Sequence, residues 1–180
     1  LPAVLTIAPM GENIMRDNVS IIETCKELEQ RGADVVGMNC FRGPTTMIPY
    51  LKEIRKIVKC YMAALPIPFR TTKKQPTFFN LDDNNGCTCP APHGRTFPTA
   101  LDPLYCNRYE IRKFAEEAND LGIKYLGVCC GAAPMHIREV AEAIGRVVPA
   151  SRYREKMSNH FIYGTNKRIP KHISDYGEKA

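Results

Sequence analysis

The chain has 180 residues and a net charge of +6, with 44% hydrophobic and 24% charged residues. These values are ordinary for a soluble globular protein with a sizeable core. No run of about 18 apolar residues marks a membrane span, so we expect no membrane partner. The sequence shows no secretory segment and begins inside a strand-like run at Leu1, so we expect further residues to precede it.

The positive charge is concentrated near the carboxyl terminus. Residues 152–179 contain seven Lys and Arg residues against three Asp and Glu residues, an excess of +4. A basic segment can bind nucleic acid. No RNA-binding or helix-turn-helix motif accompanies the charge, so nucleic acid is not the expected partner. We interpret residues 151–180 as a solvated arm or an arm that contacts another subunit.

The eight cysteines could indicate a disulfide framework. Their positions argue against it, because six of them lie in or beside strand and helix patterns rather than in a loop-rich small fold. We therefore expect reduced thiols and a cytoplasmic protein. The six are Cys25, Cys40, Cys60, Cys106, Cys129 and Cys130.

Strand and helix patterns alternate along the chain. Four strand-helix units predict a parallel sheet, and short apolar strands predict burial on both faces of it. The expected strands cover residues 3–8, 34–40, 59–67 and 124–130. The expected helices cover residues 18–31, 45–58, 107–118 and 134–147. Between residues 69 and 104 there is no periodicity, which predicts a long functional or disordered loop.

Such a sheet is either open and doubly wound or closed into a barrel. The turn at residues 9–13 (PMGEN) lacks the G-x-G-x-x-G pattern of a nucleotide-binding sheet, and no Walker sequence occurs. A barrel is therefore preferred. A full barrel has eight units and about 250 residues. We expect residues 1–150 to be the C-terminal half of a (β/α)8 TIM barrel, strands 5 to 8, and residues 151–180 to be a C-terminal extension.

Three thiols stand at the expected carboxyl ends of two strands, where parallel α/β folds keep their chemistry. Cys40 ends the second strand, and Cys129 and Cys130 end the fourth. Gly131 allows the turn that would let both neighbouring thiols reach one ion. Three thiolates with one open position are typical of a catalytic zinc that receives a sulfur substrate. The expected reaction is attack of the activated sulfur on a methyl carbon.

Other residues have two interpretations. Glu12 and Asn13 follow the first strand and either contact substrate or belong to a polar loop. His136 is either a donor behind the metal ligands or a helix-capping or solvent-facing residue. Cys87 and Cys89 are a rival metal or redox pair in the long loop. The backbone amides of residues 132–134 begin a helix and are expected to help hold the anionic thiolates.

The cysteine motifs resemble those of the homocysteine S-methyltransferases. Segment 35–40 (VVGMNC), followed by Gly43-Pro44, is similar to their first motif, and segment 127–131 (GVCCG), followed by 134–138 (PMHIR), is similar to their paired-cysteine motif. Segments 97–98, 107–115 and 118–126 are similar in particular to the betaine–homocysteine S-methyltransferases.

The resemblance implies a (β/α)8 barrel with zinc held by Cys40, Cys129 and Cys130. It implies homocysteine as the methyl acceptor, betaine or a related onium compound as the donor, and methionine as the product. It also implies a homo-oligomer formed through residues 151–180. Segment 65–70 (LPIPFR) departs from the betaine enzymes. The alternative interpretation is a catalytically inactive barrel that serves as a structural or interaction subunit of a larger assembly. A third interpretation is a redox or disulfide protein.

Overall fold

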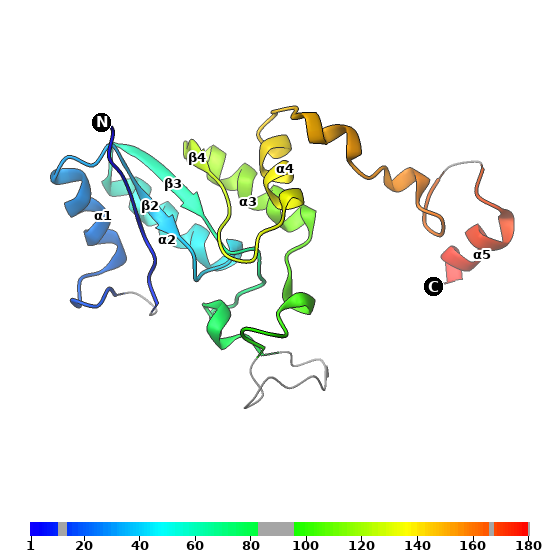
Figure 1. Cartoon of the computed structure of the whole chain (residues 1–180), viewed down its shortest axis with the longest axis horizontal. Helices are drawn as coiled ribbons and strands as arrows, with labels where there is room; N and C mark the ends of the chain where they lie inside the picture. The colour runs from blue at the N-terminus through cyan, green and yellow to red at the C-terminus, as the bar shows by residue number, and fades with distance from the viewer. Residues whose placement is uncertain (11–13, 83–95, 166–167, 180) are drawn as a thin grey trace. The chain divides into compact units, whose positions relative to one another are not determined.

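The computed structural model describes residues 1–10, 14–82, 96–165 and 168–179. These residues form two compact units, Leu1–Val147 and Val148–Ala180 (Figure 1). The first unit contains the sheet, and its strands and helices alternate in sequence. Its elements are β1 (Val4–Ile7), α1 (Ile21–Gln30), β2 (Val35–Asn39), α2 (Pro44–Ile57), β3 (Tyr61–Leu65), α3 (Arg108–Asp120), β4 (Tyr125–Leu126) and α4 (Pro134–Ala143).

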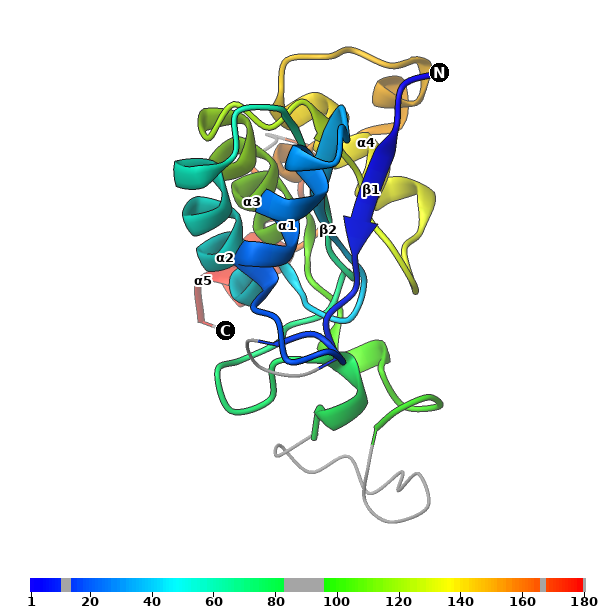
Figure 2. The same cartoon turned by 90° about the vertical axis from the view of Figure 1, so that its left-hand side faces the viewer.

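The four strands form one parallel sheet in the order β1-β2-β3-β4. Val4 is in register with Val35, Val35 with Tyr61, and Ala63 with Tyr125. Helices α1, α2 and α3 lie together on one side of the sheet (Figure 2). The α/β class and the parallel sheet are therefore confirmed.

The helix boundaries follow from local sequence signals. Ser20 caps α1 by accepting the Glu23 N–H at 3.1 Å. Asn107 caps α3 by accepting two backbone N–H groups, and the Glu110 carboxylate accepts the Asn107 N–H at 2.7 Å, which completes a capping box. Helix α2 begins directly after Gly43 with a proline at its first position. These signals explain why the predicted and observed helices begin within a few residues of each other.

The core lies between the sheet and the helices. Large apolar side chains from the inner faces of α1, α2 and α3 pack on residues of β2 and β3, and each has less than 2% of its surface exposed. Burying a side chain of this size stabilises the fold by about 1.5–3 kcal/mol. The residues are Ile21, Met38, Leu51, Ile54, Met62 and Ile111.

The expectation that every strand is buried on both faces was wrong for the first strand. Val4 and Leu5 of β1 are each 43% exposed, whereas Val36 and Met62 of the inner strands are fully buried. The reason is position, because β1 and β4 form the two edges of the sheet and have a neighbouring strand on one side only. The strand expected at residues 124–130 is also short, since β4 ends at Leu126.

The described part of the long loop is ordered by short 3-10 turns at Phe78–Asn80 and Asp102–Leu104. In the second unit, helix α5 spans Lys171–Lys179, and short 3-10 segments span Pro149–Tyr153 and Met157–Asn159. The sequence pattern predicts no helix in that segment. No helix among the described residues is long and apolar enough to cross a membrane.

Candidate metal centre

Cys40 stands at the turn that leaves the carboxyl end of β2. Its N–H donates to the carbonyl of Leu65 on the neighbouring segment at 2.9 Å, so it continues the sheet ladder by one residue. Cys40 and Phe41 both have left-handed backbone angles, with φ of 59° and 55°. Such angles are uncommon outside glycine and cluster at functional sites. The turn holds the Cys40 thiol at the rim of the sheet, where the residue is 8% exposed.

Cys129 and Cys130 follow β4 on a segment that stays bound to the sheet. The Cys129 N–H donates to the carbonyl of Pro66 at 2.8 Å. Gly131 then turns the chain with a φ of 82°. A Cβ at that position would lie 2.7 Å from two ring atoms of Phe69, so both the backbone angle and the close packing require glycine. The turn predicted at Gly131 is present.

The structure brings the three predicted thiols together. The Cys40 and Cys130 sulfurs are 3.4 Å apart, the Cys129 and Cys130 sulfurs are 3.9 Å apart, and all three lie within 4.8 Å of one another. Zinc–sulfur bonds of about 2.3 Å at tetrahedral angles place sulfurs about 3.8 Å apart. The observed separations match that value closely enough for one ion to be reached by all three thiols. None of the three is in a disulfide.

The surroundings of Cys40 favour a neutral thiol unless a metal binds. Burial, together with hydrogen bonds to the Cys130 and Cys129 side chains, raises the pKa of Cys40 to about 12. Without a cation, Cys40 is therefore a neutral thiol at physiological pH. A divalent metal deprotonates a coordinating thiol and compensates the charge of the neighbouring thiolates. The donor set of three sulfurs is the type that zinc binds.

An aromatic layer, formed mostly by the long loop with Phe41 and Tyr105, closes one side of the thiol cluster. Cys40 and Cys129 pack against it, and it continues through paired rings, including Phe69 and Tyr105 with centroids 4.7 Å apart. The Tyr105 hydroxyl donates to the carbonyl of Gly131 at 2.7 Å and so ties this layer to the turn that carries Cys130. The sequence patterns gave no sign that these rings pack together. The layer consists of Phe41, Phe69, Phe78, Phe79, Phe97 and Tyr105.

The expectation that the amides of residues 132–134 hold the thiolates was wrong. The Ala132 N–H donates to the carbonyl of Cys129 at 3.1 Å, and the Ala133 N–H donates to Nδ1 of His136 at 2.9 Å. Pro134 has no N–H. His136 therefore caps α4 through its Nδ1 atom. It is 3% exposed and stacks on Tyr105, so it does not face solvent. Burial lowers the pKa of His136, and a hydrogen bond to the Cys106 backbone opposes that shift.

Of the remaining candidates, the structure describes Cys25 and Cys106, and neither joins the cluster. Glu12 and Asn13 lie outside the described residues, as do Cys87 and Cys89. Cys25 and Cys106 are buried in the core, and burial raises the pKa of each to about 12. Within the part of the chain that the structure describes, the three-cysteine cluster is the one group of three or more potential metal ligands.

The comparisons with known proteins agree with the cysteine motifs. The family model for homocysteine S-methyltransferase matches residues 2–144. Betaine–homocysteine S-methyltransferase 1 of Xenopus tropicalis is 34% identical over 149 residues, which are 79% of this chain and 33% of the relative. The S-methylmethionine–homocysteine S-methyltransferase of Mus musculus is 32% identical over 159 residues, which are 83% of this chain and 40% of the relative. The chain therefore spans about a third of the length of these relatives.

Proposed function

Because the chain belongs to the homocysteine S-methyltransferase family, we propose that the protein transfers a methyl group to the thiol of homocysteine and releases methionine. We further propose that Cys40, Cys129 and Cys130 are the protein ligands of a Zn²⁺ ion at this site. The observation that carries the proposal is the convergence of these three sulfurs, from two strand ends, at near-tetrahedral separations.

The chemistry follows from the donor set. Cys40, Cys129 and Cys130 would hold Zn²⁺ with a fourth position open, and the ion would lower the pKa of a substrate thiol bound there, so that its sulfur is a nucleophile at neutral pH. The substrate proton leaves to solvent, a new sulfur–carbon bond forms, and the bond between the methyl carbon and the donor's onium atom breaks. The protein's own contribution is to fix the three sulfurs and to exclude water on one side with the aromatic layer.

We propose a small onium compound as the methyl donor. The names of the relatives specify betaine in one case and S-methylmethionine in the other. Both donors carry a positive charge on the atom that loses the methyl group, and transfer neutralises that charge. Glu12 and Asn13, which follow the carboxyl end of β1, are proposed to contact the substrates.

The open edges of the sheet support the proposal that residues 1–150 are strands 5 to 8 of a (β/α)8 barrel. Strands β1 and β4 are edge strands, and apolar side chains of β1 are exposed. In a closed barrel both edges pair with further strands and no edge remains. We propose that the rest of the protein supplies those strands.

Residues 151–180 are proposed to form a homo-oligomer contact. Four large aromatic side chains of this segment are exposed, which is typical of a surface that another protein covers. We also propose a cytoplasmic location, which suits the free cysteines. The exposed residues are Tyr153, Phe161, Tyr163 and Tyr176.

The alternative is an inactive barrel that serves as a structural or interaction subunit. Segment 65–70 favours this alternative. Its sequence departs from that of the betaine enzymes, and it leads directly from β3 to the aromatic layer that packs on the thiols. An assay of the full-length protein with homocysteine and either methyl-labelled betaine or methyl-labelled S-methylmethionine separates the two functions. Labelled methionine from one donor supports the enzyme. Its absence with both donors, in a protein that retains zinc, supports the inactive barrel.

A further inference from the structure

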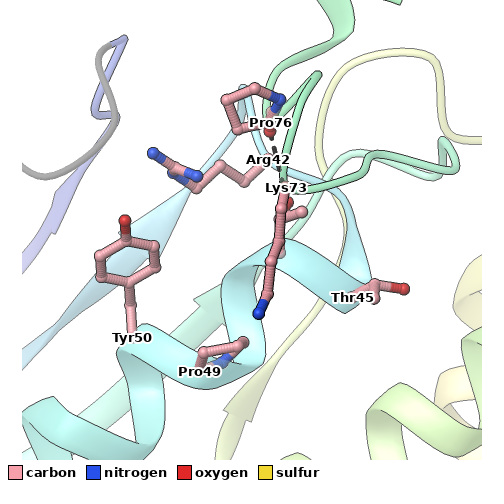
Figure 3. Close-up of a pocket in the computed structure, with 7 residues that line it drawn as sticks. Arg42, Thr45, Pro49, Tyr50, Lys73 and Pro76 are labelled. Atoms are coloured by element: carbon pink, nitrogen blue, oxygen red, sulfur yellow. Dashed lines mark hydrogen bonds between the residues drawn. The ribbon is translucent and has the colours of Figure 1, made fainter.

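The two sides of the thiol cluster are held in different ways. On the buried side, the Arg42 N–H donates to the carbonyl of Cys40 at 2.6 Å. Arg42 is itself 2% exposed, and its guanidinium lies over the Tyr50 ring (Figure 3). On the other side, Cys130 is exposed and belongs to no helix or strand. The direction of its thiol therefore depends on how the turn at residues 131–133 is held.

Two side chains from different segments bind the two ends of that turn. The Tyr105 hydroxyl donates to the carbonyl of Gly131 at 2.7 Å. At the other end, Nδ1 of His136 accepts the Ala133 N–H at 2.9 Å. The Tyr105 and His136 rings also stack on each other, with centroids 5.6 Å apart and planes inclined by 18°. The turn is thereby held at its first and last residues by side chains that support each other.

The state of His136 suits the role of an acceptor. Its side chain is buried, and burial lowers its pKa, so the ring is neutral at pH 7. A neutral imidazole that accepts at Nδ1 carries its proton on Nε2. The helix that carries His136 is also fixed, because Glu139 of α4 pairs with Arg112 of α3 at 2.6 Å and its carboxylate is 2% exposed. The acceptor that holds the turn therefore stands on a rigid support.

We propose that His136 is a positioning residue that directs the Cys130 thiol toward Cys40 through the turn at residues 131–133. The role rests on the metal site proposed above, because the thiols need a common direction only if they bind one ion. The sulfurs of Cys40 and Cys130 are 3.4 Å apart, although Cys130 is on an exposed segment. Groups that orient metal ligands without binding the ion change metal affinity by about 10- to 100-fold when they are removed.

The test is the zinc affinity of the full-length protein at pH 7, measured by competition with a chromophoric chelator. His136→Phe keeps a ring that can stack on Tyr105 but removes the acceptor. His136→Asn loses the ring, but its side-chain oxygen is bonded to Cγ, as Nδ1 is in histidine, and can accept the Ala133 N–H. We expect zinc affinity to fall at least about tenfold in His136→Phe. In His136→Asn it is expected to stay within about threefold of the unaltered protein.

His160→Phe is the matched control. His160 lies in the second unit, and its Nδ1 also accepts backbone N–H groups, those of Ile162 and Tyr163, each at 3.1 Å. Its ring likewise stacks on Tyr163. The variant therefore removes the same kind of contact away from the turn that follows Cys130, and zinc affinity is expected to be unchanged.

Cobalt(II) bound in place of zinc reports the geometry of the thiols. The intensity of its sulfur-to-cobalt absorption depends on how many thiolates bind the ion, and a purely structural role of His136 leaves this intensity unchanged at saturating cobalt. We expect a weaker absorption in His136→Phe and the full absorption in His136→Asn.

Two results overturn the role of His136. The first is unchanged zinc affinity in His136→Phe, and the second is an equal loss in His136→Phe and His136→Asn. Failure of the metal site itself appears differently, as the absence of zinc binding by the unaltered protein. In that event hydrogen exchange of the metal-free protein decides. His136→Phe is expected to raise exchange at residues 130–133 about tenfold and His136→Asn is not, whereas equal exchange in both variants overturns the hold on the turn.

Discussion

The sulfur of Cys40 lies 3.4 Å from the sulfur of Cys130, although 90 positions separate the two residues in the sequence. The contact exists because β2 and β4 end on the same rim of a parallel sheet, with β3 between them. Each thiol is held by an unusual turn, the left-handed Cys40 and Phe41 on one side and the positive-φ Gly131 on the other. The cluster is therefore a product of the fold and not of sequence proximity.

Replacing any one cysteine of the cluster tests the ligand set. We expect Cys40→Ala, Cys129→Ala and Cys130→Ala each to abolish zinc retention and methyl transfer. Each variant keeps only two of the three protein ligands that a catalytic zinc needs. Each should remain folded. Metal analysis of the purified full-length variants measures the zinc content. Cys60→Ala is the control, since Cys60 is half-buried outside the cluster and should keep its zinc. Full zinc in any of the three variants would remove that cysteine from the site.

Gly131→Ala tests the turn that carries Cys130. The substitution places a Cβ 2.7 Å from the Phe69 ring at a φ of 82°, so strain and overlap add together. We expect the free energy of unfolding to fall by about 2–4 kcal/mol and zinc affinity to fall with it. Denaturant unfolding measures the first effect, and metal titration measures the second.

Gly122→Ala is the matched control for the turn. Gly122 has a similar φ of 75°, but a Cβ there meets nothing within 4 Å. We expect a loss of about 1 kcal/mol, from backbone strain alone, and no change in zinc affinity. Equal losses in the two variants would show that packing against Phe69 does not constrain the turn.

Tyr105→Phe tests the link between the aromatic layer and the thiol cluster. The variant keeps the ring that packs on Phe69 but removes the hydroxyl that donates to the Gly131 carbonyl at 2.7 Å. We expect a loss of about 1 kcal/mol in the free energy of unfolding. Tyr109→Phe is the comparison, because Tyr109 is 59% exposed and loss of its hydroxyl should change stability by less than about 0.5 kcal/mol. An unchanged stability in Tyr105→Phe would show that the hydrogen bond to the Gly131 carbonyl does not stabilise the fold.

Glu110 gives a pH-dependent prediction. Burial raises its pKa, but hydrogen bonds from Arg70 and the Asn107 N–H outweigh burial and hold the pKa of Glu110 below its usual value of 4.5. A lowered pKa in the folded state stabilises the protein above pH 4.5, and this contribution is lost as the pH falls through the folded value. Glu110→Gln should therefore cost about 0.5–1 kcal/mol at pH 7, a modest amount because both partners are partly exposed.

The pH dependence of that cost is measured by urea unfolding at several pH values. The difference between Glu110→Gln and the unaltered protein should shrink as the pH falls below 4.5. Glu116→Gln, an exposed change on the same helix, should show a smaller difference than Glu110→Gln at pH 7. A difference that is independent of pH would mean that the charge of Glu110 does not contribute.

Local signals predicted the elements well, because Ser20, Gly43-Pro44 and Asn107 determine their helix starts through contacts a few residues away. The grouping of the thiols was also predictable, since parallel strands align their carboxyl ends. The aromatic layer depends instead on contacts between distant segments. Such contacts, for example the packing of Phe69 against Gly131, leave no periodic pattern in the sequence. The exposure of β1 depends on which strands lie next to it in the sheet. The pattern of apolar residues within β1 does not indicate its neighbours.

The most direct test of the metal centre is zinc-edge X-ray absorption on the full-length protein, with and without homocysteine. The proposed function predicts about one zinc per chain with three sulfur ligands at about 2.3 Å, and a fourth sulfur when homocysteine is added. A zinc shell that does not change with homocysteine, or a protein that binds no zinc, would contradict a thiol-activating site at Cys40, Cys129 and Cys130.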